Sequence, residues 1–294
     1  MPPAPTLSEA RAYTRGLARS HYENFLVVSA LLPRRLRQPM FDVYAYCRSV
    51  DDLGDEAEGD RPALLDGWER QLRECFAGSA RHPVFVALAS TIRDHDLPLE
   101  PFLRLIDANR QDQTVRRYET YAQLEEYCRS SANPVGRLVL LLFGYRDERR
   151  FRLSDATCTA LQLANFWQDV AVDYRLGRIY LPLEDMRRFG CREQDVASGS
   201  ATDSFRRLMA FEVRRARDLF ATGEGLIPLV DERLRVDLRL FSLGGREILN
   251  RIEAQDYDVL SRRPTVAAWR QLGLLVRAVL AERRRISARQ AADV

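Results

Sequence analysis

The chain has 294 residues, of which 46% are hydrophobic and 30% charged, and its formal net charge is +3. These values are typical of a globular protein with a sizeable core, and the near balance of charge argues against a dedicated nucleic-acid binder. All 45 basic residues are arginine, so Schiff-base chemistry, a P-loop lysine and a Ser–Lys pair are excluded.

Helical periodicity dominates the chain, and strand signals are scarce. We therefore predict one all-α domain over residues 8–285, with a disordered lead at 1–7 and a disordered tail at 286–294. The segment 21–32 is mixed, and the terminal helix is amphipathic; we expect it to face the core rather than a membrane surface. The predicted helices cover residues 8–19, 40–50, 61–77, 83–95, 101–111, 121–131, 137–144, 154–174, 202–222, 226–241, 244–257 and 265–284.

The cysteines and the N-terminus indicate a cytoplasmic protein. The five cysteines lie far apart without a CxxC, and residues 1–8 lack the apolar region of a secretory signal. No run of 18 apolar residues occurs, so we expect no membrane span.

An acidic stretch follows the predicted helix 40–50. Asp51 and Asp55 are four residues apart, so on a continuing helix their carboxylates share one face, where like charges repel. Arg48 lies three residues earlier, on nearly the same face. The pattern fits either a solvated acidic helix end or a site that a cation neutralises.

A second polar stripe lies on the predicted helix 154–174. Gln162, Asn165, Asp169 and Asp173 are offset by 3, 7 and 11 residues, which places them on one narrow face. The rest of this helix is apolar, and buried carboxylates are costly unless they are paired or bind a metal. A solvent-facing stripe on a surface helix is the alternative.

The two aspartate pairs together favour a metal site. Oxygen ligands without accompanying histidine or cysteine suit Mg²⁺, which usually also binds substrate phosphates, whereas zinc is disfavoured. Arg48 could grip a diphosphate with two parallel hydrogen bonds. The residues alone therefore suggest a helical cavity in which Mg²⁺ holds a diphosphate and aromatic walls shield a carbocation.

Two signatures resemble the squalene/phytoene synthase family, the head-to-head prenyl synthases of the all-α isoprenoid synthase fold, a single-domain helical bundle around a central cavity. One signature runs from Tyr44 to Asp55, and the other runs from Leu161 to Asp173 and is followed by residues 177–182. Residues 21–25, 107–112 and 130–136 most resemble bacterial hydroxysqualene synthases of the hopanoid pathway.

This resemblance implies a reaction and its residues. Presqualene diphosphate would lose pyrophosphate with the help of two or three Mg²⁺ ions, rearrange as a carbocation and be captured by water, without NADPH, to give hydroxysqualene. Asp51, Asp55, Asp169 and Asp173 would hold the metal with Asn165, and Tyr127 would face the reacting centre. The implied substrate contacts are Tyr44, Arg48, Gln162, Asn165, Arg178, His21, Tyr22 and Asn24.

The chain departs from the family pattern at several positions. Gln168 replaces a basic residue, Ala108–Asn109 replaces a Gly–Met pair, Gly244–Gly245 lack an aromatic, and Tyr22 and Asn24 replace small hydroxyl residues. Fewer diphosphate contacts fit an enzyme that handles one diphosphate rather than two.

Several alternatives stay open. The rivals are a presqualene diphosphate, squalene or phytoene synthase and a non-catalytic assembly factor of the same fold. Asn133 either positions the attacking water or is only a turn residue before Pro134. The expected partners are an isoprenoid diphosphate and, for release of the lipid product, a peripheral membrane contact, but no nucleic acid.

Overall fold

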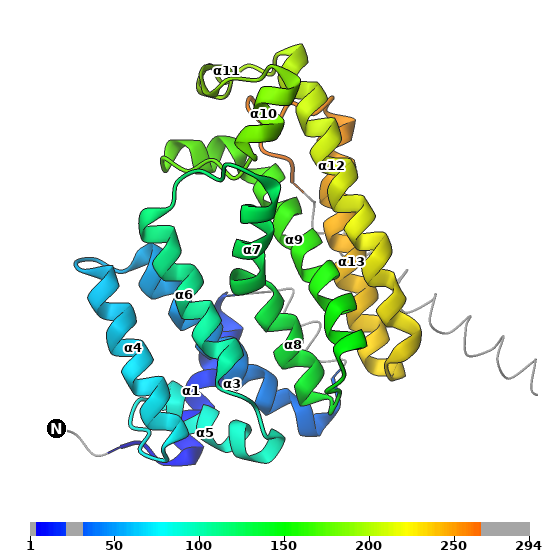
Figure 1. Ribbon diagram of the computed structural model, residues 1–294. Helices are drawn as coiled ribbons and strands as arrows, with labels where there is room; N and C mark the ends of the chain where they lie inside the picture. Colours follow the sequence, from blue (N-terminus) through cyan, green and yellow to red (C-terminus); the bar gives the residue numbers. More distant parts are fainter. Residues whose placement is uncertain (1–3, 22–31, 266–294) are drawn as a thin grey trace, which may run out of the picture. The chain divides into compact units, whose positions relative to one another are not determined.

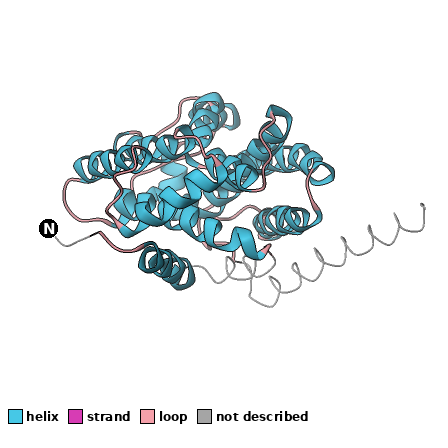
Figure 2. Ribbon diagram, turned by 90° about the horizontal axis from the view of Figure 1, so that it is seen from below, coloured by secondary structure: helices cyan, strands magenta, loops and turns pink. Residues whose placement is uncertain are grey.

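The computed structural model describes residues 4–21 and 32–265. In this part of the chain the regular structure is helical, as predicted, apart from an isolated parallel bridge between Arg117 and Ile179 (Figure 2). No helix in these residues is both long enough and apolar enough to cross a membrane. The chain forms two compact units, residues 1–115 with 129–151 and residues 116–128 with 152–294, which are described separately.

The first unit consists of helices from the N-terminal half of the chain (Figure 1). Its elements are α1 (Leu7–His21), α3 (Arg34–Asp51), the π-helix η1 (Asp52–Glu56), α4 (Arg61–Phe76), α5 (Pro83–His95), α6 (Glu100–Thr114) and α8 (Asn133–Leu142).

The second unit contains most of α7 (Tyr121–Ser131) and of the long helix α9 (Glu148–Arg175). Its other elements are α10 (Leu183–Phe189), α11 (Glu193–Ala197), α12 (Asp203–Gly223), the 3₁₀ helix η2 (Glu224–Leu229) and α13 (Glu232–Ala254).

Aromatic packing fixes α3 in the core of the first unit. Tyr46 is fully buried, packs edge-on against Phe102 at a centroid distance of 5.0 Å and donates a hydrogen bond of 2.8 Å to the Phe102 carbonyl. Trp68 and Phe85 pack beside it. Aromatic side chains carry large apolar areas, so this cluster ties α3 to α4, α5 and α6.

A buried polar network ties α3 to α1 and α5. The Asp42 carboxylate is fully buried and accepts hydrogen bonds from Thr14 and Thr91 at 2.7 Å and from Gln38 at 2.8 Å. Burial raises the pKa of Asp42, and the three hydrogen bonds oppose that rise. A buried carboxylate with these partners is satisfied, so the network orients the helix that carries the first acidic stretch.

Close helix packing defines the core of the second unit, where α12 lies beside α13 (Figure 1). A Cβ atom added to Gly245 of α13 would lie 2.4 Å from the Phe220 ring of α12 and 2.9 Å from Leu161 of α9. Such contacts are too short for any side chain, so Gly245 permits the approach of three helices.

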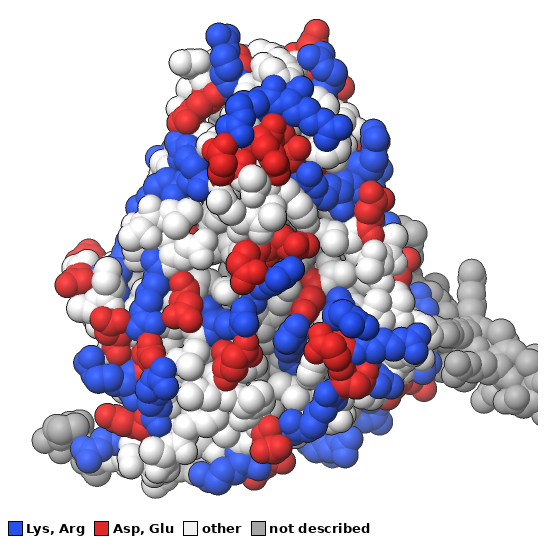
Figure 3. Space-filling view, viewed as in Figure 1, with Lys and Arg blue, Asp and Glu red and all other residues white. Residues whose placement is uncertain are grey.

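On the molecular face shown in Figure 3, arginine and acidic side chains are interspersed.

Two predicted helix boundaries are wrong because proline was given too much weight. α3 begins at Arg34, directly after Pro33, and not at residue 40, so Pro39 lies inside the helix. Leu36 is buried, and its packing anchors the first turn despite the proline. Asn133 and Pro134 form the first turn of α8, and the predicted break there falls only at Ala132.

Other predicted boundaries are also wrong. α9 begins at Glu148, so Ser154 is a buried residue inside the helix and not its N-cap. The two helices predicted at 226–241 and 244–257 are η2 and one continuous α13, because Gly245 serves helix packing and neither Gly244 nor Gly245 breaks the helix. The segment 21–32 lies almost entirely outside the described residues, as does the helix predicted at 265–284.

Candidate active site

The first acidic stretch lies where α3 changes into a π-helix. Asp51 is the last residue of α3 and Asp55 lies in η1, where the Ala57 amide donates to the Asp52 carbonyl at 2.8 Å, five residues back. The helix was predicted to end at residue 50, and in the structure it continues past that residue as a π-turn with both aspartates exposed to solvent. Single π-turns inside helices are frequent at functional sites.

Asp51 lies in an environment that disfavours its charged form. Protein packed around it raises the pKa of its carboxyl to about 6, the Asn109 hydrogen bond opposes this, and repulsion by Asp55 adds to it. A bound cation would relieve this repulsion between neighbouring carboxylates.

Arg48 is already engaged with acidic partners. Its guanidinium lies 2.6 Å from Asp52 and 2.5 Å from Glu56, and its side chain is 27% exposed. Tyr44, one turn earlier on α3, is half-buried. Arg48 would have to exchange these carboxylates for a diphosphate in order to play the predicted role.

The second polar stripe lies along the accessible side of α9. Asn165 is exposed and Gln162, Asp169 and Asp173 are half-buried. The intervening apolar residues are buried, namely Leu163, Ala164, Phe166, Trp167 and Val170. The stripe was predicted from its spacing, and the structure places it on one side of the helix with oxygen atoms that reach solvent.

Asp169 has a cationic partner that the sequence did not reveal. Arg263 pairs with its carboxylate through two guanidinium nitrogens, one of which lies 3.1 Å from the second oxygen. The buried Gln168 side chain donates a hydrogen bond of 2.5 Å to the Pro264 carbonyl and so holds this segment on α9. Gln168 stands where the family pattern has a basic residue before Asp169. The guanidinium of Arg263, which follows α13 in the chain, pairs with the Asp169 carboxylate instead.

Tyr127 belongs to a buried aromatic cluster of the second unit. Phe166 and Tyr180 stack with centroids 3.8 Å apart and planes 8° from parallel, and Tyr127 lies 6.1 Å from Phe166 and 5.9 Å from Tyr180. Tyr118 also stacks with Tyr180, with ring centroids 5.8 Å apart. Aromatic faces stabilise nearby cations, so such a cluster could shield a carbocation.

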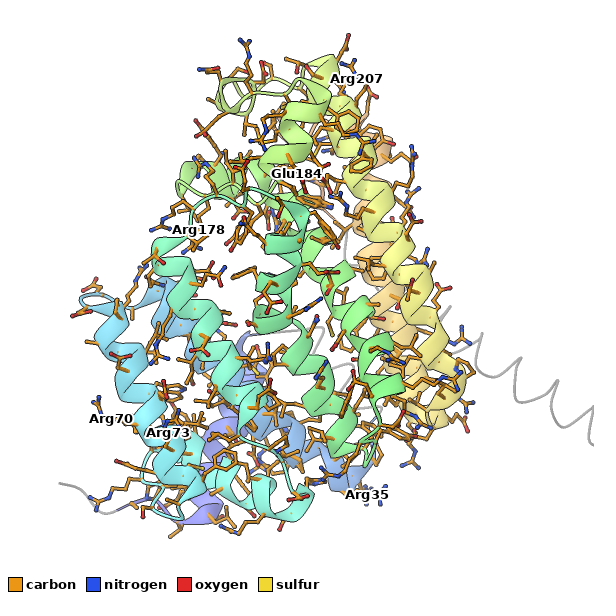
Figure 4. All side chains as sticks on the ribbon, viewed as in Figure 1. Arg35, Arg70, Arg73, Arg178, Glu184 and Arg207 are labelled. Atoms are coloured by element: carbon orange, nitrogen blue, oxygen red, sulfur yellow. The ribbon has the colours of Figure 1, made fainter. Side chains whose placement is uncertain are left out.

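The segment after α9 is held against residues 116–119. The Ile179 amide donates to the Arg116 carbonyl at 2.9 Å, and the Leu183 amide donates to the Tyr118 carbonyl at 2.9 Å. The Glu184 carboxylate accepts a hydrogen bond of 2.6 Å from the Tyr121 amide. Arg178 and Glu184, labelled in Figure 4, come from this segment, which therefore presents Arg178 from a hydrogen-bonded frame.

Of the remaining predicted site residues, some lie in the part of the chain that the structure describes and others lie outside it. Asn133 is buried at the start of α8, with 4% of its surface exposed. His21 ends α1, and Tyr22 and Asn24 lie outside the described residues.

Three residues near the acidic pairs were missed as site residues. Asn109 and Gln113 of α6 contact η1, and Arg263 contacts Asp169. The four-residue spacing of Asn109 and Gln113 on one helix was the available signal, whereas Arg263 is 94 residues from its partner and gave none.

Comparison with known proteins agrees with these signatures. Residues 18–270 match the squalene/phytoene synthase family. The chain belongs to this family. It is 34% identical to 15-cis-phytoene synthase of Synechococcus elongatus over 289 residues, which cover 94% of each chain.

Solved structures of the family share its helical fold. Squalene synthase HpnC from Alicyclobacillus acidocaldarius is 54% identical with a TM-score of 0.83, covering 85% of this chain and 95% of that one. A dehydrosqualene synthase solved with a ligand is 29% identical with a TM-score of 0.87, covering 95% and 98%. The predicted all-α isoprenoid synthase fold is therefore confirmed, as is a family of head-to-head prenyl transferase enzymes.

The donor atoms of each acidic pair fit the divalent metal that squalene/phytoene synthases use. Among the described residues no three His, Cys, Asp or Glu side chains cluster around one point, so each pair offers two carboxylates. Mg²⁺ commonly takes one or two carboxylates and completes its shell with water and substrate phosphates. The exposed Asp51 and Asp55 suit this arrangement, and Asp169 suits it once Arg263 is displaced.

Proposed function

We propose that this protein converts presqualene diphosphate and water into hydroxysqualene and pyrophosphate in a Mg²⁺-dependent reaction. The observation that carries the proposal is that all four aspartates reach solvent on α3–η1 and α9 in a chain 54% identical to a squalene synthase. The missing basic residue before Asp169 supports a site for one diphosphate rather than two.

In the proposed reaction each acidic pair would hold metal, Asp51 and Asp55 on α3–η1 and Asp169 and Asp173 on α9, where Asn165 would be a further ligand. Bound Mg²⁺ would supply Lewis-acid stabilisation of the departing diphosphate. No protein nucleophile is needed, because ionisation of the carbon–oxygen bond leaves a carbocation.

The other residues would bind the substrate and shield the cation. Arg48 and Arg178 would donate hydrogen bonds to the diphosphate oxygens, with Tyr44 and Gln162 as further polar contacts. Tyr127, in its cluster with Phe166 and Tyr180, would turn aromatic surface towards the cation and limit the approach of water. Water capture then gives the alcohol without a hydride donor.

Product analysis tests this proposal. Purified protein is incubated with Mg²⁺ and presqualene diphosphate, with and without NADPH, and separately with farnesyl or geranylgeranyl diphosphate. We expect hydroxysqualene from presqualene diphosphate, unchanged by NADPH. Squalene formed only with NADPH, or rapid condensation of two farnesyl diphosphates, would contradict the proposal, and phytoene from geranylgeranyl diphosphate would place the chain with its phytoene synthase relatives.

A further inference from the structure

Helix α6 presents two amide side chains to the π-helix η1. Asn109 and Gln113 are four residues apart, and Asn109 is buried with 8% of its surface exposed. The Gln113 amide donates to the Gly54 carbonyl at 3.0 Å and to the Asn109 carbonyl at 2.9 Å. We call these two side chains the amide clamp, because together they hold η1 against α6.

Gly54 allows the clamp to close. A Cβ atom added to Gly54 would lie 2.0 Å from Oδ1 of Asn109 and 2.9 Å from its Cγ, far inside van der Waals contact. The buried Gly54 therefore lets η1 pack directly on the Asn109 amide. A π-turn contains one more residue than a turn of α-helix. The contact between Gly54 and Asn109 determines where in the chain this additional residue lies.

The same packing sets the direction in which Asn109 donates. Its Oδ1 is directed at Gly54, and its Nδ2 lies 3.1 Å from the Leu105 carbonyl and 3.4 Å from Oδ1 of Asp51. Two acceptors on the Nδ2 side fix the orientation of the amide. The longer bond runs from this neutral donor to one oxygen of Asp51, a residue that is also exposed to solvent.

We infer that Asn109 is a positioning residue that orients Asp51 towards a divalent cation, an inference that rests on the proposed metal site. A neutral donor is suited to this task, because a cationic partner would compete with the metal for the carboxylate. In the other unit, by contrast, the Asp169 carboxylate is paired with the Arg263 guanidinium. Partners that orient metal-binding side chains typically contribute 10- to 100-fold in metal affinity or activity.

The test is a thermal-shift titration with Mg²⁺ in the presence of pyrophosphate, followed by the Mg²⁺ dependence of turnover. Asn109→Leu keeps the branched shape but removes the donor, and we expect about tenfold more Mg²⁺ for the half-maximal shift. Asn250→Leu makes the same chemical change at an exposed position of α13. Its Mg²⁺ midpoint is expected to equal that of the wild-type protein. A merely structural role would lower the unfolding temperature without Mg²⁺ but leave the Mg²⁺ midpoint unchanged.

The outcomes separate the two hypotheses. An Asn109→Leu protein with a wild-type Mg²⁺ midpoint overturns the role of Asn109 alone. Wild-type protein that shows no Mg²⁺-dependent shift overturns the proposed metal site, and this inference with it. If Asn109→Leu does not fold, Asn109→Ala removes the amide without adding bulk near Gly54, and the same midpoint criterion applies.

Discussion

Asp51 and Asp169 can each lose their charge with almost no change in volume. We expect Asp51→Asn and Asp169→Asn to lower turnover by at least the ~100-fold that partners of metal-binding side chains can contribute, because a direct metal ligand is lost. The unfolding temperature should not fall appreciably, since Asp51→Asn removes a charge that its surroundings disfavour and the half-exposed Asp169–Arg263 pair contributes only about 0–1 kcal/mol. Steady-state kinetics and thermal unfolding measure both effects.

The matched control for these substitutions is Asp218→Asn. Asp218 is exposed on α12, away from both acidic stretches in the sequence, so its loss of charge should leave turnover unchanged. Near-normal turnover of Asp51→Asn or Asp169→Asn would contradict the metal assignment.

Cys47 is close to the acidic pair, yet we expect Cys47→Ser to retain turnover. Burial raises the pKa of its thiol, and the charge of Asp51 adds to that rise, so the thiolate needed for a nucleophile or metal ligand is not formed at neutral pH. Turnover and alkylation by iodoacetamide at pH 7 are the measurements. Strong inactivation of the wild-type enzyme by modification of Cys47 would show that this prediction is wrong.

At the scale of single elements, alanine substitutions at the two adjacent glycines of α13 should affect stability differently. Gly245→Ala would drive a methyl group into Phe220 and Leu161, and overpacking of this kind typically costs about 1–3 kcal/mol. In the described part of the chain no atom lies within 4 Å of a Cβ added to Gly244, so Gly244→Ala should be neutral or stabilise the helix by up to ~1 kcal/mol. Chemical denaturation of both variants measures the difference, and equal effects would contradict the packing argument.

The same glycines show why helix existence was predicted better than helix boundaries. Apolar periodicity identified most of the long helices, because it reflects which face is buried. A glycine pair also fits a break, and only the tertiary contact with Phe220 reveals that Gly245 serves helix packing. Likewise, Pro39 does not begin α3, since buried side chains on either side of it outweigh one lost hydrogen bond.

The candidate site was predictable where its pattern was local. Four-residue spacing singled out the aspartate pairs, and resemblance to the family predicted Tyr127 as a site residue, whereas its aromatic cluster comes from separate segments of the chain. The π-turn at Asp52–Glu56 could not be predicted, because it depends on the fit between Gly54 and Asn109. Nor could Arg263, whose contact with Asp169 joins distant parts of the chain.

At the scale of the whole molecule, one buried acid of α13 should make stability depend on pH. Asp237 has 2% of its surface exposed, and its buried Oδ1 atom has no hydrogen-bond partner among the residues that the structure describes. Burial raises its pKa from 3.8 to about 8, and the negative charge of Asp231 adds to the rise. Between pH 4 and 8 the folded state therefore binds more protons at this residue than the unfolded state does.

The sign of the effect follows from this proton balance. A folded-state pKa above the unfolded value means that the contribution of Asp237 to stability falls as pH rises from about 4 to about 8, by at most about 1.4 kcal/mol per pH unit. The Asp237→Asn protein does not lose stability in this way. The difference in unfolding temperature between this variant and wild type should therefore increase steadily as the pH rises from 4 to 8.

Thermal unfolding of both proteins at pH 4, 6 and 8 checks the prediction. The raised pKa of the buried Glu212 affects both proteins equally, so it cancels in the difference between them. Asp218→Asn, an exposed change on α12, should give no pH-dependent difference. A difference between Asp237→Asn and wild type that is constant with pH would mean that Asp237 is charged in the folded protein, and a buried cationic partner would then have to be sought.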